Sequence, residues 1–123
     1  FTKILGVSIL TSIDSKQTGK FYNQKDVSFL VKKFAKIAKK NGLDGVVCSP
    51  KEIKVIRKAT GKNFIIVTPG IRLKSKITSD DQKRVETPEK AIEMGANYLV
   101  IGRPITKSKN PLKTLKEIND KLS

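Results

Sequence analysis

The sequence contains no histidine, no tryptophan and a single cysteine, Cys48. Without histidine there is no imidazole to act as an acid or base near neutral pH, and a catalytic triad built on histidine is excluded. One cysteine cannot form an internal disulfide, which fits a reducing cytoplasm. Because protein zinc sites are built mainly from cysteine and histidine, a metal site is not expected.

Acidic residues are also scarce, since 11 Asp and Glu stand against 26 Lys and Arg, for a formal net charge of +15. Such a charge attracts polyanions at low salt. Arginine, whose planar guanidinium is the usual reader of bases and phosphates, nevertheless occurs only at Arg57, Arg72, Arg84 and Arg103. The lysines are scattered, without a dense block or interleaved aromatics. We therefore expect a lysine-rich solvated surface, and a nucleic-acid-binding module is the outside hypothesis.

Long apolar runs are absent. None approaches the ~18 residues of a membrane-spanning helix, and no charged-apolar-small leader opens the chain, so neither a membrane span nor a signal peptide is expected. The first residue is Phe1 rather than methionine, which hints at a missing upstream segment. A chain of 123 residues is one domain or less. It is roughly half of an ordinary α/β barrel of about 250 residues.

Short apolar runs alternate with helical stripes along the chain. The runs predict strands over residues 4–10, 45–48, 64–67 and 98–101, and the stripes predict helices over 25–40, 50–60, 87–94 and 110–122. Residues 12–23 are predicted as a polar loop. Three of the helices open with a capping residue followed by proline, at Ser49, Thr87 and Asn110, and Glu52 is placed to close a capping box with Ser49.

Strands that alternate with helices form parallel sheets through right-handed crossovers. Two α/β architectures fit: an open four-stranded layer, or half of a (β/α)₈ TIM barrel with four parallel strands alternating with four helices. Four strands cannot close a barrel, so residues 1–123 are expected to be a single, incomplete domain with bare outer strands. Self-association or marginal stability follows from this expectation.

In parallel α/β folds the functional site lies at the carboxyl ends of the strands, and barrels often bind phosphate between the last two loops. These loops hold three of the four arginines, together with Gly102, which lets a backbone approach an anion closely. Arg103 can bind a phosphate in bidentate fashion. Residues 71–86 form a long polar segment of the kind that often acts as a lid. Ordinary solvated loop residues are the alternative reading.

Five segments, in this order, resemble the carboxyl-terminal half of the orotidine 5′-phosphate decarboxylase family. They are GVSILTS, GLDGVVCSPKE, IIVTPGIR, DDQKRVETPEKAIEMGANYLVIGRPI and NPLKTLKEI, and they cover nearly the whole chain. The specific part is the combination of VTPGIR, DDQKRV and YLVIGRPIT at these distances. The resemblance implies that the four predicted strands are strands five to eight of the barrel.

The resemblance also implies an activity and a set of binding residues. The family removes CO₂ from orotidine 5′-phosphate to give UMP in de novo pyrimidine biosynthesis, without a cofactor. Implied substrate-binding residues are Thr11 for the pyrimidine, Arg72 at the root of the lid, Gln82 on the lid, and Gly102 with Arg103 for the phosphate; Pro69 would line the pocket. The implied partners are the nucleotide and either a second copy or the missing half-barrel.

The proton-transfer groups of the family cannot be placed in this sequence. They are a lysine and a D-x-K-x-x-D signature from earlier strands. Asp14, Ser15 and Lys16 imitate its start, but Gly19 stands where the last aspartate is needed. No catalytic residue is therefore assigned, and the chain alone is expected to be inactive. The alternative hypothesis is a non-catalytic remnant that binds phosphate or nucleotide.

Overall fold

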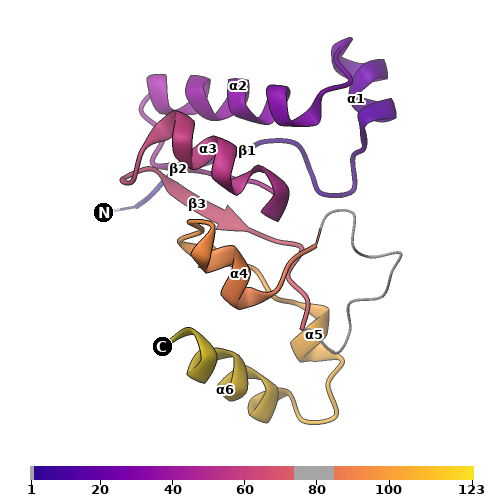
Figure 1. The fold of residues 1–123 in the computed structure, drawn as a ribbon, viewed down its shortest axis with the longest axis vertical. Coiled ribbons are helices and arrows are strands. Elements are labelled where there is room, and N and C mark those ends of the chain that lie inside the picture. Colours follow the sequence, from indigo (N-terminus) through magenta and orange to yellow (C-terminus); the bar gives the residue numbers. More distant parts are fainter. Residues whose placement is uncertain (1, 74–84) are drawn as a thin grey trace.

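The computed structural model describes residues 2–73 and 85–123, and its centre is one parallel sheet (Figure 1). The strands are β1 (Leu5–Val7), β2 (Gly45–Val47), β3 (Ile65–Thr68) and β4 (Tyr98–Leu99), hydrogen-bonded in the order β1-β2-β3-β4. Every neighbouring pair is parallel. The prediction of four parallel strands is confirmed. Strands β1, β2 and β4 are shorter than the predicted apolar runs, and β3 lies one residue later than predicted, at Ile65–Thr68.

Helices connect the strands and follow the last one. They are α1 (Ser15–Tyr22), α2 (Val27–Lys40), the 3₁₀ helix η1 (Pro50–Glu52), α3 (Ile53–Thr60), α4 (Pro88–Glu93), α5 (Arg103–Thr106) and α6 (Pro111–Leu122). Four of them, α2, α3, α4 and α6, correspond to predicted helices. The predicted alternation of four strands with four helices is confirmed, and α1 and α5 are additional helices.

Helix α1 corrects the prediction of a loop over residues 12–23. Asp14 accepts a hydrogen bond from the backbone nitrogen of Gln17 at 2.9 Å, and the Gln17 side chain accepts one from the backbone nitrogen of Asp14 at 3.0 Å. This reciprocal capping box satisfies two amide groups that a helix start leaves unpaired. Asn23 ends the helix in the left-handed conformation, with φ 51°. Few apolar residues and Gly19 concealed this helix from a reading based on hydrophobic periodicity.

The capping predictions had mixed outcomes. Thr87 and Asn110 accept hydrogen bonds from the backbone nitrogens three residues later, as predicted. Ser49 does not: it makes no side-chain cap to the backbone, and its hydroxyl donates to the Glu52 carboxylate instead. Both side chains are buried, so the pair satisfies two polar groups that solvent cannot reach.

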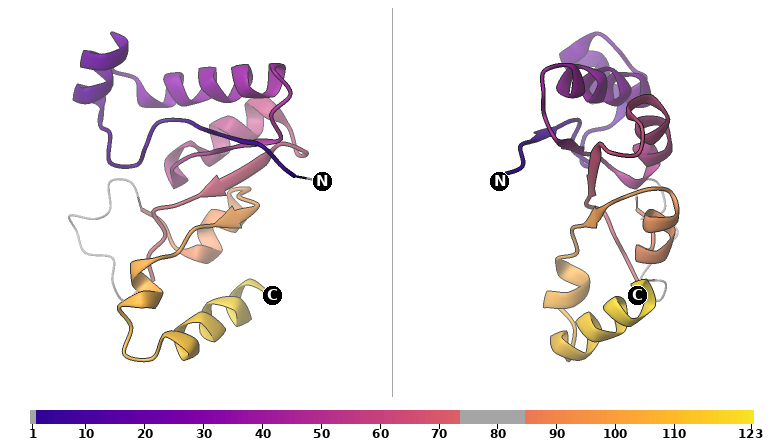
Figure 2. Two further views of the ribbon diagram at one scale, coloured as in Figure 1. Left: turned by 180° about the vertical axis from the view of Figure 1, so that it is seen from behind. Right: turned by 90° about the vertical axis from the view of Figure 1, so that its left-hand side faces the viewer.

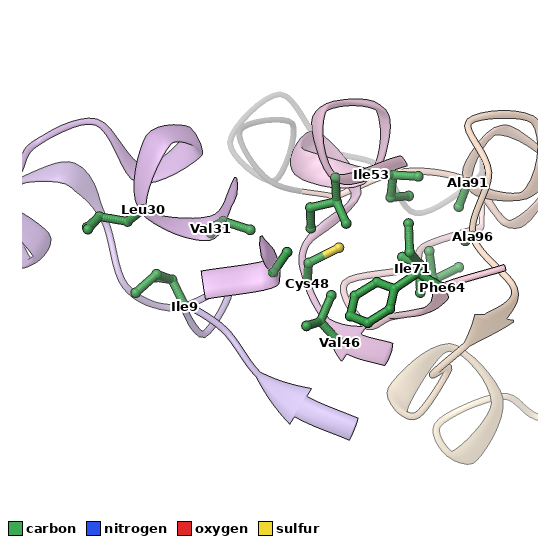
Figure 3. Packing of buried hydrophobic residues seen from close by; sticks show 13 residues of the cluster. Ile9, Leu30, Val31, Val46, Cys48, Ile53, Phe64, Ile71, Ala91 and Ala96 are labelled. Carbon is green, nitrogen blue, oxygen red and sulfur yellow. The ribbon is translucent and has the colours of Figure 1, made fainter. Parts of the chain in front are cut away.

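The hydrophobic core lies between one face of the sheet and the helices. Val46 of β2 and Ile66 of β3 belong to the same buried cluster as Val31 of α2 and Ile53 of α3, and all four are at most 1% exposed. Figure 3 shows this packing from close by, with the Cys48 thiol among the aliphatic side chains. Gly45 permits the close approach of β2 and β3, since a Cβ there would overlap the Ile65 carbonyl.

Within residues 2–73 and 85–123, no helix covers the other face of the sheet. The strand register places Val7, Val47, Val67 and Tyr98 in one row across all four strands. Val7 at the β1 edge is 65% exposed and Tyr98 at the β4 edge is 62% exposed. In the right-hand view of Figure 2, helices α2, α3, α4 and α6 form an arc around one side of the strands. An inner face of this kind is what half a barrel presents.

Arg57 of α3 holds together the loops that precede β3 and β4. Its Nη1 donates to the carbonyls of Gly61 and Phe64, each at 2.7 Å, and to that of Lys62 at 3.1 Å. Its Nη2 donates to the Gly95 carbonyl at 2.6 Å and to Asn97 Oδ1 at 2.7 Å. One guanidinium thus joins the loop that contains Gly61 to the loop that contains Gly95, a geometry that no ammonium group can reproduce.

We predict that Arg57→Lys lowers the free energy of unfolding by about 2 kcal/mol or more, because the charge is kept but most of these hydrogen bonds are lost. Urea unfolding followed by circular dichroism measures the change. Lys58→Ala, an exposed change on the same helix, is the control and should shift stability by less than about 0.5 kcal/mol. Equal effects of the two substitutions would contradict the role given to Arg57.

Candidate functional site

The four segments that follow the strands meet at one edge of the sheet because all strands run in the same direction. The hydrogen-bond ladder continues past the strand ends: Cys48 N donates to Val67 O at 3.0 Å, and Val100 N donates to Thr68 O at 2.9 Å. The loops after β2, β3 and β4 are therefore held side by side at their roots. This edge is the candidate site.

The turn after β3 fixes both ends of the predicted lid segment. Gly70 has φ 79°, a left-handed conformation that favours glycine. Ile71, which is 1% exposed, forms a parallel bridge with Glu86. Arg72 N donates to the Glu86 carbonyl at 2.9 Å, and Glu86 N donates to the Gly70 carbonyl at 3.2 Å. Gln82 and the other residues from 74 to 84 lie outside the described part of the chain.

Arg72 sits directly beside this clamp. It is half-buried, and its Nη1 donates to the Ile71 carbonyl at 2.9 Å. The carboxylate of nearby Glu86 accepts from the backbone nitrogen of Thr87 at 3.0 Å. The backbone position of Arg72 is therefore set by the end of β3, and one edge of its guanidinium is engaged by its own main chain.

Gly102 and Arg103 follow β4 and begin the short helix α5. The Gly102 carbonyl accepts from Ile105 N at 2.9 Å and Thr106 N at 3.0 Å, while Pro104 is buried beneath. Arg103 is exposed, and a Cβ placed on Gly102 would meet no atom within 4 Å. Within the described part of the chain, the glycine backbone therefore faces open space. Sequence reasoning missed α5, although the proline after Gly102-Arg103 is a recognised signal for a helix start.

Thr11 lies on the opposite side of this edge. It is half-buried in the turn after β1, whereas Gly102 and Arg103 follow β4, and these are the two outer strands. Three strand spacings of about 4.8 Å separate them along the sheet. The structure brings Arg72 and Arg103 to adjacent strand ends and places Thr11 far from both.

A cluster of buried polar side chains lies beneath the ends of β2 and β3. Cys48 is 1% exposed, and Ser49 and Thr68 are fully buried beside it in the sequence and in the sheet. Burial, aided by the negative charge of Glu52, raises the pKa of the Cys48 thiol to about 12. The thiolate is the nucleophilic form, so Cys48 is a packing residue, as predicted, and not a reactive one.

We predict that Cys48 in the folded protein at pH 8 reacts with Ellman's reagent at least about 100-fold more slowly than in the unfolded chain, because burial and a raised pKa both suppress the thiolate. Absorbance at the thiolate product's band, with and without guanidinium chloride, measures the ratio. Rapid labelling of a protein whose circular dichroism shows it folded would contradict this assignment.

No three His, Cys, Asp or Glu side chains gather in a metal-binding group within residues 2–73 and 85–123. No helix in these same ranges has the length and apolarity to cross a membrane.

Comparison with known proteins identifies the family. A model described as the orotidine 5′-phosphate decarboxylase / HUMPS family matches residues 1–118. The chain belongs to this family. An orotidine 5′-phosphate decarboxylase of Coxiella burnetii (strain RSA 493 / Nine Mile phase I) is 50% identical over 116 residues, which are 94% of this chain and 49% of that protein. One of Geobacter sp. (strain M21) is 44% identical over 120 residues, or 98% of this chain and 50% of that protein.

A crystal structure of orotidine 5′-phosphate decarboxylase from Lactobacillus acidophilus shows the same arrangement. The two structures superimpose with a TM-score of 0.79 at 34% sequence identity. The match covers 98% of this chain and 49% of the Lactobacillus acidophilus chain. The chain spans about half the length of the relatives it matches. Its four parallel strands and helices match half of an orotidine 5′-phosphate decarboxylase barrel, which decides between the two architectures that the sequence left open.

Proposed function

We propose that this chain supplies the pyrimidine- and phosphate-binding half of an orotidine 5′-phosphate decarboxylase, and that residues 1–123 are one incomplete domain of it. The reaction would convert orotidine 5′-phosphate to UMP and CO₂ in the cytoplasm. The observation that carries the proposal is the placement of Arg72 and of Gly102-Arg103 at adjacent strand ends, beside open space, in a chain of this family.

The phosphate is the group that this arrangement suits best. Arg103 is exposed and can direct two parallel N–H groups at phosphate oxygens, and Gly102 lets the anion approach the main chain. Arg72 contributes a second positive charge at the next strand end. Thr11, at the far side of the edge, would then bind the pyrimidine, and Gln82 would bridge base and phosphate from the lid segment.

The chemical step needs groups that this chain does not provide. Loss of CO₂ breaks the bond between the carboxylate and carbon 6 of the ring and leaves the electron pair on that carbon, where a proton must be delivered. The family uses a lysine for this proton, beside carboxylates of a D-x-K-x-x-D signature. The contribution of this half is binding energy remote from the reacting carbon, which favours catalysis only when it holds the substrate in the strained position.

We predict that UMP binds this chain and that Arg103→Ala weakens binding about 10- to 100-fold, as expected for the loss of a charged hydrogen-bonding partner of a phosphate. Isothermal titration calorimetry measures both affinities. Uridine, which lacks the phosphate, should bind wild type and variant equally. Lys107→Ala, at the other end of α5, is the control and should bind UMP like the wild type. Equal UMP affinities for wild type and Arg103→Ala would remove the phosphate site.

We predict that the chain alone releases no CO₂ from orotidine 5′-phosphate and that activity appears when the D-x-K-x-x-D half of a relative is added. The loss of substrate absorbance on conversion to UMP follows the reaction. Decarboxylation by the chain alone would contradict the assignment of the catalytic groups. UMP binding without activity in the mixture would favour the alternative, a non-catalytic nucleotide-binding remnant, because the absent signature is what motivates that alternative.

A further inference from the structure

Asn97 lies directly before β4 and fixes the start of that strand against β3. Its backbone nitrogen donates to the Ile66 carbonyl at 2.9 Å. Its side-chain Oδ1 accepts a hydrogen bond from the Ile66 nitrogen, also at 2.9 Å. Asn97 thus pairs with both main-chain groups of Ile66, a fully buried residue of β3. This two-point contact sets which residue of β3 lies opposite the start of β4.

The Arg57 guanidinium holds the Asn97 side chain in this position. Arg57 Nη2 donates to Asn97 Oδ1 at 2.7 Å and to the Gly95 carbonyl at 2.6 Å. Arg57 Nη1 is held by carbonyls of the loop before β3, at Gly61 and Phe64. Asn97 Oδ1 therefore accepts from two donors, one in β3 and one tied to the loop before β3. Because both donors are fixed on the β3 side, the oxygen can reach both of them in one register only.

The strand that follows this contact is too short to fix its own register firmly. Strand β4 has two residues, which pair with Val67 and Thr68. Within the described residues, β3 is its only hydrogen-bonded neighbour. A parallel strand rises about 3.3 Å per residue and its side chains alternate between faces, so the smallest slip that keeps the faces is about 6.6 Å. The contact at Asn97 is the feature that opposes such a slip at the start of β4.

The register of β4 against β3 also sets where Arg103 lies relative to Arg72, since one follows β4 and the other follows β3. Val100 N donates to the Thr68 carbonyl at 2.9 Å, so the register set at Asn97 extends to the ends of both strands. Groups that bind a ligand must be held within about 0.5 Å of their productive places. A change of register would therefore carry one arginine away from a phosphate that the other holds.

We propose that Asn97 is a positioning residue for the phosphate site: it fixes the register of β4 against β3 and thereby places Gly102-Arg103 beside Arg72. This inference rests on the proposed function, because it assigns Asn97 a role in nucleotide binding. Asn97 lies at the opposite end of β4 from Arg103. It acts on the phosphate only through the placement of the segment after β4.

Isothermal titration calorimetry with UMP and with uridine tests the proposal. Asn97→Ala removes the acceptor that Ile66 and Arg57 share, and it should weaken UMP binding about tenfold while uridine binding stays unchanged. Asn97→Asp keeps an acceptor oxygen at this place and should bind UMP like the wild type. Asn63→Ala, at an exposed asparagine in the loop before β3, is the matched control and should also bind UMP like the wild type.

A double-mutant cycle shows whether Asn97 acts through Arg103. In Arg103→Ala there is no guanidinium to position, so adding Asn97→Ala should weaken UMP binding further by less than about twofold. A role of Asn97 in general stability would instead give the same loss of affinity in both backgrounds. The two residues lie at opposite ends of β4, so a direct contact between them does not account for the expected coupling.

Circular dichroism should show every variant folded, since Asn97 is exposed. If Asn97→Ala does not fold, Asn97→Gln replaces it in both experiments, with the same expected results, because it keeps the amide but displaces its oxygen by one methylene. Equal UMP affinities of wild type and variant, equal losses for UMP and uridine, or additive effects in the cycle would overturn the role of Asn97 and leave the proposed function standing. A wild type that does not bind UMP would overturn the proposed function and this inference with it.

Discussion

Parallel pairing of the strands is the constraint from which the other features of this molecule follow. Because β1 to β4 run in one direction, each connection must cross back over the sheet, and the helices that do so gather on one face. The segments after the strands then share one edge, where Arg72 and Arg103 follow adjacent strands. Among the described residues, the same arrangement leaves Val7 and Tyr98 exposed at the two ends of one row, so the candidate site and this exposed row have one cause.

The two ends of the sheet have different compositions and different roles. At the amino-terminal end, Arg57 is saturated by carbonyls of the loops it joins, and Gly95 with φ 109° packs against its side chain. At the carboxyl end, Arg103 is exposed and Gly102 faces open space. A guanidinium whose donors are already engaged stabilises the fold, whereas one that projects into solvent is free to bind an anion. Chemically identical side chains thus serve opposite ends of the half-barrel.

The sequence predicted those elements whose signals are local and redundant. Helix α2 combines an apolar stripe with an Asn41-Gly42 stop, and Thr87 and Asn110 combine capping side chains with a following proline. Helix α1 was missed because its signal is only the pair Asp14 and Gln17, without an apolar stripe. The Ser49 cap was wrong because a buried Glu52 accepts the hydroxyl's hydrogen bond in place of the backbone amide. Burial of a carboxylate is a tertiary property that spacing along a chain does not reveal.

By itself the sequence determined the parallel α/β class, the order of strands and main helices, and the family, since these depend on periodicity, caps and motifs that each occupy a few consecutive residues. The tertiary structure decided which strands lie at the edges, that the Arg57 guanidinium ties together loops distant in sequence, and that Arg72 and Arg103 follow neighbouring strands while Thr11 follows the far one. The physical reason is that the sequence does not show whether an arginine side chain is surrounded by carbonyls or by solvent. The packing of segments distant in the sequence determines which of the two environments each arginine has.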